Sequence, residues 1–198
     1  MSKKRPGLLI VLSAPSGTGK TTVMKEFFRQ DKNLVDSVSW TTRKPRHGEK
    51  HKKDYFFVSR KKFTQAIKNG GFLEWAKVYH EFYGTPKDYV TKKLASGKDV
   101  VLVIDTRGAQ KVRHFKPSVH IFLKPPSIAV LKKRLKGRNS DSAKQLAARL
   151  KEVRYEMSQA DRYDYRIVNH TVPQTVREVE KILKRERAKI LKTTKGRK

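Results

Sequence analysis

The feature that most constrains this chain is an apolar run that leads directly into a glycine-rich turn. Residues Leu8 to Leu12 are all apolar, which predicts a strand buried on both faces of a parallel sheet. A helix is expected after the turn, which reads Ala14-Pro15-Ser16-Gly17-Thr18-Gly19-Lys20-Thr21. A strand, such a turn and a helix form a phosphate-binding loop, whose backbone N–H groups and helix N-terminus converge on a phosphate.

Two side chains of this loop can take part in nucleotide chemistry. Lys20 places a charge near the β- and γ-phosphate oxygens, and the Thr21 hydroxyl can ligate Mg²⁺. Ala14 departs from the motif, which begins with glycine, and a positive φ at this position would strain it. The alternative is an ordinary strand-to-helix turn, but the intact Gly-Lys-Thr sequence between a strand and a helix favours the phosphate-binding loop.

The rest of the chain repeats the order of strand and helix. Continuous apolar runs predict further strands at Val100 to Ile104, Val119 to Leu123 and Tyr165 to Val168. Apolar residues recur every three to four positions in two later segments, which predicts helices around residues 146–157 and 176–183. This alternation indicates an α/β fold, in which helices pack on a central parallel sheet.

A segment at residues 40–96 interrupts this alternation. It contains strand-like stretches at Tyr55 to Val58 and Phe72 to Phe82, with a helix-like stretch, Lys61 to Lys68, between them. We therefore predict an inserted lobe. With 198 residues, the chain is expected to form one domain with lobes rather than two independent domains.

Composition excludes several classes of function. The chain has no cysteine, so disulfides, thiolate zinc sites and cysteine nucleophiles are excluded, which fits a reducing compartment and predicts a cytoplasmic protein. The apolar runs are too short to cross a bilayer, so the protein is expected to be soluble. The six histidines form no metal-binding pattern, and we interpret them as surface or loop residues.

The net charge of +30 attracts nucleotides, nucleic acids and anionic surfaces alike. Much of this charge lies at the chain ends, including a basic tail at residues 188–198. A solvated basic surface is the simpler interpretation. Nucleic acid is expected to bind non-specifically at most, because the sequence has no helix-turn-helix, zinc or RNA-recognition pattern.

The stretches that follow the phosphate-binding loop resemble the guanylate kinase family, most clearly at residues 37–49, 54–58, 72–76 and 83–85. The resemblance extends from Gly7 to about Arg187. It implies a P-loop NTPase fold with three kinds of segment, namely a core with a central parallel sheet at 7–39, 97–125 and 160–187, a GMP-binding lobe at 40–96 and a helical lid at 126–159. It also implies an enzyme of purine nucleotide metabolism that uses ATP and Mg²⁺ to phosphorylate GMP and dGMP.

The resemblance assigns GMP recognition to residues that also make chemical sense for it. A phosphate dianion suits two forked guanidinium groups and two hydroxyl donors, here Arg43, Arg46, Tyr55 and Tyr83. Glu49 would orient an arginine. A carboxylate accepts from guanine N1–H and the exocyclic amine, and hydroxyls address O6 or N7, which implies guanine readers at Glu74, Ser39 and Thr85. Adenine offers Glu74 no N1–H.

The resemblance also assigns residues near the ATP phosphates. Cations on a closing lid would stabilise the transition state, and the resemblance assigns this role to Arg134, Arg138 and Arg149. Lys20 and Arg43, which lie outside the lid, would act with them. Asn169 would lie near the adenine. Asp105 would help to bind GMP or hold the water shell of Mg²⁺, but the family usually has an acidic residue two positions earlier, where this chain has Val103.

Two other functions remain open. A catalytically inactive domain of the same fold that binds protein partners typically lacks the P-loop lysine or the acceptor residues, whereas this chain keeps Lys20, Thr21, Arg43, Arg46 and Glu74. Nucleic-acid binding through the positive charge can coexist with either function.

Transfer to GMP needs no serine, cysteine or histidine nucleophile, because the phosphate oxygen is already anionic and only has to be aligned.

Overall fold

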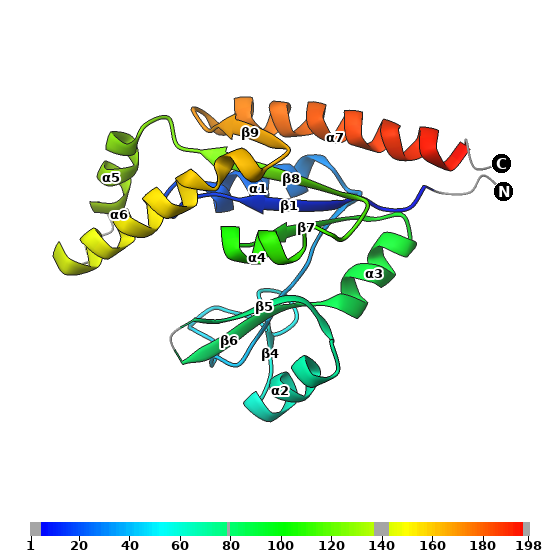
Figure 1. The fold of residues 1–198 in the computed structure, drawn as a ribbon, viewed down its shortest axis with the longest axis horizontal. Coiled ribbons are helices and arrows are strands. Elements are labelled where there is room, and N and C mark those ends of the chain that lie inside the picture. Colours follow the sequence, from blue (N-terminus) through cyan, green and yellow to red (C-terminus); the bar gives the residue numbers. More distant parts are fainter. Residues whose placement is uncertain (1–4, 79, 137–142, 196–198) are drawn as a thin grey trace.

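The computed structural model describes residues 5–78, 80–136 and 143–195, and its central feature is a five-stranded sheet (Figure 1). In spatial order its strands are β2 Leu34–Asp36, β7 Asp99–Val103, β1 Leu9–Ser13, β8 Ser118–Lys124 and β9 Tyr165–Val168. Every adjacent pair is parallel. The predicted α/β fold with a central parallel sheet is therefore confirmed. Strand β2 was not predicted, because three residues are too few for a periodic signal.

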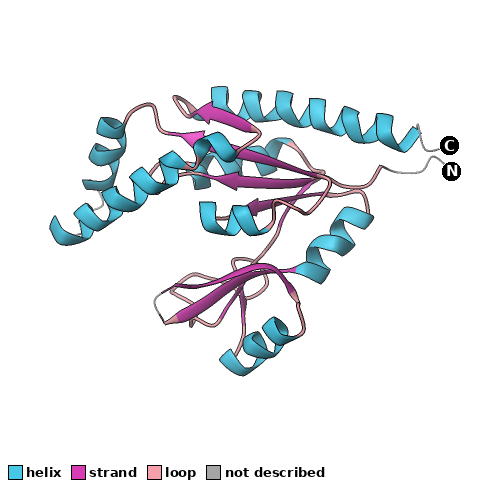
Figure 2. Cartoon of the chain, in the orientation of Figure 1, coloured by secondary structure: helices cyan, strands magenta, loops and turns pink. Residues whose placement is uncertain are grey.

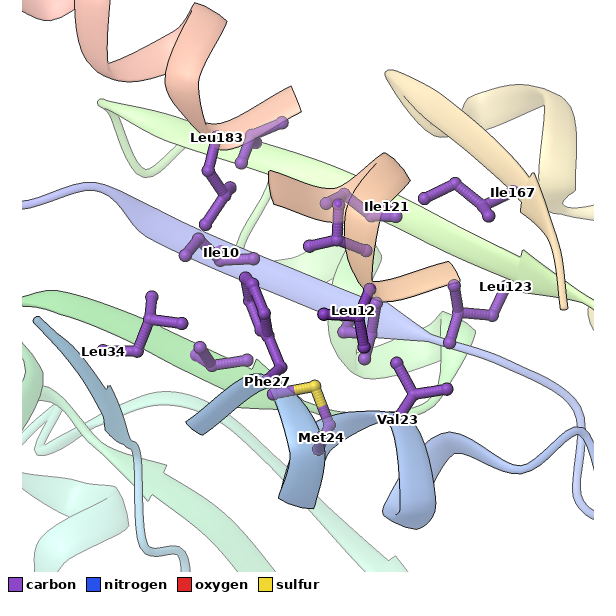
Figure 3. Close-up of a cluster of buried hydrophobic side chains, with 14 of the residues drawn as sticks. Ile10, Leu12, Val23, Met24, Phe27, Leu34, Ile121, Leu123, Ile167 and Leu183 are labelled. Atoms are coloured by element: carbon purple, nitrogen blue, oxygen red, sulfur yellow. The ribbon is translucent and has the colours of Figure 1, made fainter. Parts of the chain in front are cut away.

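Helices cover both faces of this sheet (Figure 2). On one face lie α1 Lys20–Gln30 and α7 Val172–Lys195, and on the other lie α3 Lys87–Ala95 and α4 Thr106–Lys111. Side chains alternate along β1, so that Ile10 and Leu12 pack with α1 and α7 (Figure 3), whereas Leu9 and Val11 pack with α3 and α4. Burial on both faces explains why β1 has no polar residue at alternate positions.

A second, four-stranded sheet forms within residues 40–96. Its strands lie in the order β4 Phe56–Phe57, β3 Trp40–Thr41, β6 Glu81–Pro86 and β5 Phe72–Val78. Helix α2 Arg60–Lys68 covers this sheet through Phe63, which is fully buried. The centroid of the Phe63 ring lies 4.4 Å from that of Phe72 and 5.4 Å from that of Phe82. Stacked aromatic rings thus form a small separate core for this lobe.

One strand prediction in this lobe is wrong. The sequence predicts a single strand-like stretch at Phe72 to Phe82, whereas the structure has the antiparallel pair β5 and β6, with Val78 opposite Glu81. The residues between the two strands include no glycine, proline, asparagine or aspartate that would signal a turn. The pairing matters for the site because it sets Glu74 opposite Thr85.

Two further helices, α5 Ile128–Lys136 and α6 Ala143–Ser158, occupy one end of the molecule (Figure 1). They pack through Leu131 and Val153, both fully buried. At the start of α5, the Ser127 hydroxyl accepts a hydrogen bond of 3.1 Å from the Val130 amide, which caps the helix. The short 3-10 helix η1 Ala160–Arg162 then leads into β9.

The long helix α7 is held to the sheet by a buried carboxylate. Asp99 accepts hydrogen bonds from the Leu8 amide at 2.7 Å, from Arg5 at 2.7 and 2.8 Å and from Arg187 at 2.7 Å. Burial alone would raise the pKa of Asp99, but these bonds and the charge of Arg187 lower it. Residues 188–195 of the predicted basic tail continue α7 as a helix. Within the described ranges, every helix is too short or too polar to cross a membrane.

One histidine contradicts the interpretation of all six as surface or loop residues. His120 lies in β8 and is only 1% exposed. Its amide donates to Asp164 at 2.8 Å, and its ring packs edge-on to Tyr163, with the centroids 6.2 Å apart. Burial lowers the pKa of His120 from 6.5 to about 4, with Arg113 acting in the same direction and Asp164 opposing it. His120 is therefore a neutral core residue at pH 7.

His120 is expected to make the protein sensitive to acid. Below pH 6.5 the unfolded chain binds a proton at His120, whereas the folded chain does so only near pH 4. This contribution to the free energy of unfolding is therefore lost as pH falls from 6.5 to 4, by about 2 kcal/mol between pH 6.5 and 5. Urea denaturation of the wild type and His120→Gln at pH 7 and pH 5 measures this loss. The variant should lose less stability than the wild type; an equal loss in both would contradict a buried, neutral His120.

Candidate active site

The phosphate-binding loop forms one wall of a cleft of about 450 Å³. The loop turns through Gly17 and Gly19, whose φ angles of 84° and 95° lie in the left-handed region that glycine tolerates. Helix α1 begins directly afterwards at Lys20. The cleft is lined by Ala14, Pro15, Ser16, Gly17, Gly19, Lys20, Thr21, Thr22, Asp105, Glu152 and Glu156. Thr18 is not among these residues and is fully buried.

The alanine at the start of the loop carries no backbone strain. Among the described residues other than glycine, only Val38 and Lys52 have a positive φ, so Ala14 does not adopt the conformation that would have penalised it. Ala14 is also buried, at 2% exposure, as part of the core around α1. The departure from the glycine of the motif is therefore compatible with the loop geometry.

Lys20 lies within the cleft, surrounded by opposite charges. Its Nζ donates to the Ala14 carbonyl at 3.3 Å, so the ammonium group lies over the backbone of the loop. Burial lowers the pKa of Lys20, while the carboxylates of Glu156 and Asp105 oppose that shift. In the cleft, phosphate oxygens of a bound nucleotide would take the place of these carboxylates as the negative partners of the ammonium group.

Two carboxylates of this cleft were missed in the sequence. Glu152 and Glu156 lie on α6, on the same helical face as Arg149, at spacings of three and four residues. This spacing is the signal that could have identified them. Burial raises the pKa of Glu156 to about 7, Lys20 opposes this shift, and Glu152 and Asp105 add to it.

The lobe brings together Arg43, Tyr55 and Tyr83, three of the residues predicted to bind the acceptor phosphate, with Glu49. Arg43 forms a forked ion pair with Glu49, with both N–O distances 2.9 Å. Its guanidinium carbon lies 5.6 Å from the ring centroid of Tyr55, and the rings of Tyr55 and Tyr83 are 6.0 Å apart. The pKa of Arg43 is raised, first by Glu49 and also by a hydrogen bond to Tyr83. Glu49 thus holds the guanidinium group of Arg43 in place.

Arg46 joins this group through its backbone. Its amide donates to Glu49 at 2.7 Å, and its side chain is exposed. The hydrogen bonds from Arg43 and from this amide lower the pKa of Glu49 to about 2. Glu49 is therefore a stable carboxylate at neutral pH, and it fixes both the Arg43 side chain and the loop that carries Arg46.

Glu74 and Thr85, which are predicted to recognise guanine, lie side by side on the hairpin formed by β5 and β6. The Thr85 hydroxyl donates to Glu74 at 2.6 Å, and both residues are buried. Burial raises the pKa of Glu74, the bond from Thr85 opposes this shift, and Asp105 adds to it. Ser39 is half-buried immediately before β3, where its carbonyl accepts the Phe56 amide at 2.9 Å.

A glycine at the start of α4 allows the two halves of the site to meet. Asp105 caps α4 by accepting the Gly108 amide at 2.7 Å. A Cβ atom at Gly108 would lie 3.2 Å from Glu74 Oε2 and 3.4 Å from Asp105 Oδ1. A side chain at this position would crowd both carboxyl groups, and glycine avoids this. Asp105 thus lies between the lobe and the cleft that contains Lys20.

Asn169 is bound to the phosphate-binding loop itself. Its Nδ2 donates to the Thr18 carbonyl at 2.7 Å, and its Oδ1 accepts from the Thr175 hydroxyl at 2.8 Å. Its Nδ2 would also lie 2.9 Å from a Cβ atom at Gly19. These contacts make Asn169 an anchor for the loop, and its contact with adenine stays a prediction.

The arginines predicted for the lid are only partly described. Arg149 lies on α6 and is half-exposed. Arg134 lies in α5, but its side chain is outside the described part of the chain, as is the whole of Arg138. Val103, at the end of β7, is 36% exposed, so the missing acidic residue would have faced partly into solvent.

Comparison with known proteins identifies the family. A model of the family described as guanylate kinase matches residues 6–186. The chain belongs to the guanylate kinase family. It is 47% identical to a guanylate kinase of Wolbachia pipientis wMel over 97% of this chain and 96% of the relative, and 44% identical to one of Caldanaerobacter subterraneus subsp. tengcongensis over 96% and 93%.

The likeness to the guanylate kinase family extends to three dimensions. A crystal structure of guanylate kinase from Anaplasma phagocytophilum superposes with a TM-score of 0.73 at 37% identity, covering 92% of this chain and 87% of that one. The family and the P-loop NTPase fold inferred from the sequence are both confirmed. The division into core, lobe and lid and the roles of individual residues stay predictions.

Proposed function

We propose that this protein transfers the γ-phosphoryl group of ATP to GMP, giving ADP and GDP in purine nucleotide metabolism. The observation that carries this proposal is the meeting of two sites at Asp105. On one side, Asp105 lines the phosphate-loop cleft with Lys20. On the other side, it approaches Glu74 of the lobe across Gly108. Donor and acceptor can therefore be held on either side of a single carboxylate.

The chemistry requires alignment and charge neutralisation rather than a protein nucleophile. The GMP phosphate oxygen attacks the γ-phosphorus directly, and its proton has already been lost. Arg43, held by Glu49, would grip that phosphate with the hydroxyls of Tyr55 and Tyr83, and Arg46 would supply a second guanidinium group. Lys20 would bind the β- and γ-phosphate oxygens and stabilise the charge that develops in the transition state.

Lid arginines complete the proposed transition-state site. Arg134, Arg138 and Arg149 would approach the transferred group when the lid closes and would expel water from the cleft. The position of α6 supports this role, since it carries Glu152 and Glu156 into the cleft and Arg149 lies on the same face. Asn169 would fix the phosphate-binding loop and contact the nucleotide base.

Base choice would be set in the lobe. Glu74 would accept hydrogen bonds from guanine N1–H and the exocyclic amine, while Ser39 and Thr85 would address O6 or N7. None of these contacts involves the ribose 2′-hydroxyl, so dGMP should also be a substrate. Asp105 would assist on the same edge of the base or through metal-bound water.

The side chains near the N-terminus of α1 are chemically suited to bind Mg²⁺. Thr21 is exposed in the first helical turn and lines the cleft with Asp105, and hydroxyl, carboxylate and phosphate oxygens are the ligands that Mg²⁺ prefers. Thr21 would hold the ion directly, and Asp105 would hold its water shell. When bound, Mg²⁺ neutralises phosphate charge during transfer.

A coupled assay tests the proposal by offering ATP with GMP, dGMP, AMP, CMP and UMP in turn. GMP should be the best acceptor, dGMP should react, and the other three should react poorly. No activity with any acceptor would favour the alternative, an inactive domain of the same fold that binds protein partners. The presence of Lys20, Thr21, Arg43 and Glu74 in this chain supports the enzyme.

The basic surface and the absence of cysteine support two further proposals. The protein would act in the cytoplasm, and nucleic acid would bind it weakly and without sequence preference. Binding to an arbitrary duplex should weaken ~40-fold between 50 and 200 mM salt if ~3 phosphates are contacted. Removing residues 192–198 should reduce this salt dependence, as fluorescence anisotropy would measure. A sequence-specific complex that survives high salt would contradict the non-specific assignment.

A further inference from the structure

An arginine outside the predicted site connects α4 to α6 at the edge of the phosphate-loop cleft. Arg107 lies in the first turn of α4, two residues after Asp105. It donates to both carboxylate oxygens of Glu152, at 2.5 and 3.4 Å. Its guanidinium carbon also lies 4.5 Å from the ring centroid of Tyr155. Arg107 therefore interacts with two residues of α6 at once, by an ion pair and by a cation–π contact.

The partner of Arg107 is one of the carboxylates that line the cleft. Glu152, Glu156 and Asp105 all lie there, with Lys20 as the cation among the described residues that line it. A triphosphate brings several negative charges into the same space. Any carboxylate left unneutralised near those charges repels them, because the cleft walls screen charges less than bulk water does. A cation that neutralises Glu152 therefore favours nucleotide binding.

Neighbouring charges are consistent with such a role for Arg107. The pKa of Glu156, one turn further along α6, is raised to about 7 first by burial and further by Glu152 and Asp105, while Lys20 and Arg107 oppose the shift. The pKa of Arg107 is raised, above all by its bond to Glu152. The field of Arg107 thus reaches the inner part of the cleft as well as its edge.

The contacts of Arg107 contribute little to the stability of the fold. The side chains of Arg107 and Glu152 are 55% and 48% exposed, and ion pairs with this exposure contribute little to folding. The cation–π contact at an exposed site is also modest. The effect of Arg107 on a polyanion in the cleft is larger, because Arg107 neutralises Glu152 and each phosphate charge interacts with Glu152 separately.

We propose that Arg107 is a positioning residue for ATP, which neutralises Glu152 and keeps that carboxylate directed away from the nucleotide phosphates. This inference rests on the proposed transfer from ATP. It predicts a specific relation between the two residues: loss of Arg107 is harmful only while Glu152 keeps its charge.

The test compares Arg107→Gln, Glu152→Gln and the double variant with the wild type. Arg107→Gln should raise the KM for ATP about tenfold, while the KM for GMP changes less than about twofold. Glu152→Gln should not raise the KM for ATP. The double variant should return to within about threefold of the wild type, because the repulsive charge is gone. The defect of Arg107→Gln should also shrink at high salt.

A matched control is available on α1. Arg29→Gln removes another exposed arginine–glutamate pair, Arg29 with Glu26, and should leave the KM for ATP unchanged. Melting temperatures measured on all variants identify any loss of folded protein. If the wild type transfers no phosphate, binding of a non-hydrolysable ATP analogue gives the same comparison, so that failure of the proposed activity is distinguished from failure of this inference.

Three results would overturn the role of Arg107. An unchanged KM for ATP in Arg107→Gln would exclude any part in nucleotide binding. A double variant as defective as Arg107→Gln would mean that Arg107 acts on the phosphates directly rather than through Glu152. A defect in Glu152→Gln equal to that in Arg107→Gln would mean that the ion pair only braces α6 against α4.

Discussion

Lys20→Ala is expected to lower kcat for GMP phosphorylation by roughly 10³-fold or more, because the variant removes the cation that balances the transferred phosphoryl group. Lys20 is the lysine at the phosphate-binding loop, and its ammonium group lies over the loop backbone, 3.3 Å from the Ala14 carbonyl. The other cations assigned to the reaction lie on different elements, so none of them replaces the charge of Lys20 at the loop. Steady-state kinetics with GMP as acceptor measures the loss.

The fold should tolerate this substitution. Burial lowers the pKa of Lys20, which means that the folded protein holds this charge unfavourably. Removing it therefore should not lower the melting temperature. Lys25→Ala, at an exposed position of the same helix, is the matched control and should keep full activity. Near wild-type turnover by purified Lys20→Ala would show that the loop does not bind the reacting phosphates.

The parts of this protein that sequence predicts well are those determined by neighbouring residues. Strand β1 was predicted because both of its faces are buried, which leaves an uninterrupted apolar run. The phosphate-binding loop followed from the spacing of Gly17, Gly19 and Lys20. The resemblance implied that Glu49 orients an arginine, and in the structure this is Arg43, only six positions earlier in the chain.

The parts that sequence did not predict depend on how separate elements pack. Arg107 and Glu152 are 45 residues apart, and neither carries a local signal that names the other. His120 was assigned to the surface because a single histidine does not reveal which strand will bury it. The hairpin was read as one strand because its turn lacks the usual turn residues.

The residues proposed to bind guanine could also not be linked to each other by local sequence signals. Glu74 and Thr85 each resemble ordinary surface residues when they are taken alone, and only the resemblance to a family linked them. The structure supplies the physical connection, since antiparallel pairing of β5 with β6 puts the two residues opposite each other. A buried carboxylate with one hydroxyl partner, at 2.6 Å, retains acceptor capacity for further donors.

Glu74→Gln is expected to lower kcat/KM for GMP by roughly 200- to 20,000-fold, since two hydrogen bonds to a charged acceptor contribute about 1.5–3 kcal/mol each. The amide is nearly isosteric, and Thr85 can still donate to its oxygen. Its NH₂ group, however, would face the N–H donors of guanine, where neither side can accept. Adenine offers no N1–H, so activity with AMP should change much less and the GMP to AMP preference should fall.

The control for this prediction lies on the same hairpin. Glu81, at the start of β6, also accepts a hydrogen bond from a threonine hydroxyl, that of Thr42. Glu81→Gln makes the same chemical change away from the proposed base site and should leave both acceptors unaffected. Kinetics with GMP and AMP for both variants, beside their melting temperatures, separates base recognition from folding. An unchanged preference for GMP over AMP in folded Glu74→Gln would remove Glu74 from the base site and leave guanine selection to Ser39, Thr85 and Asp105.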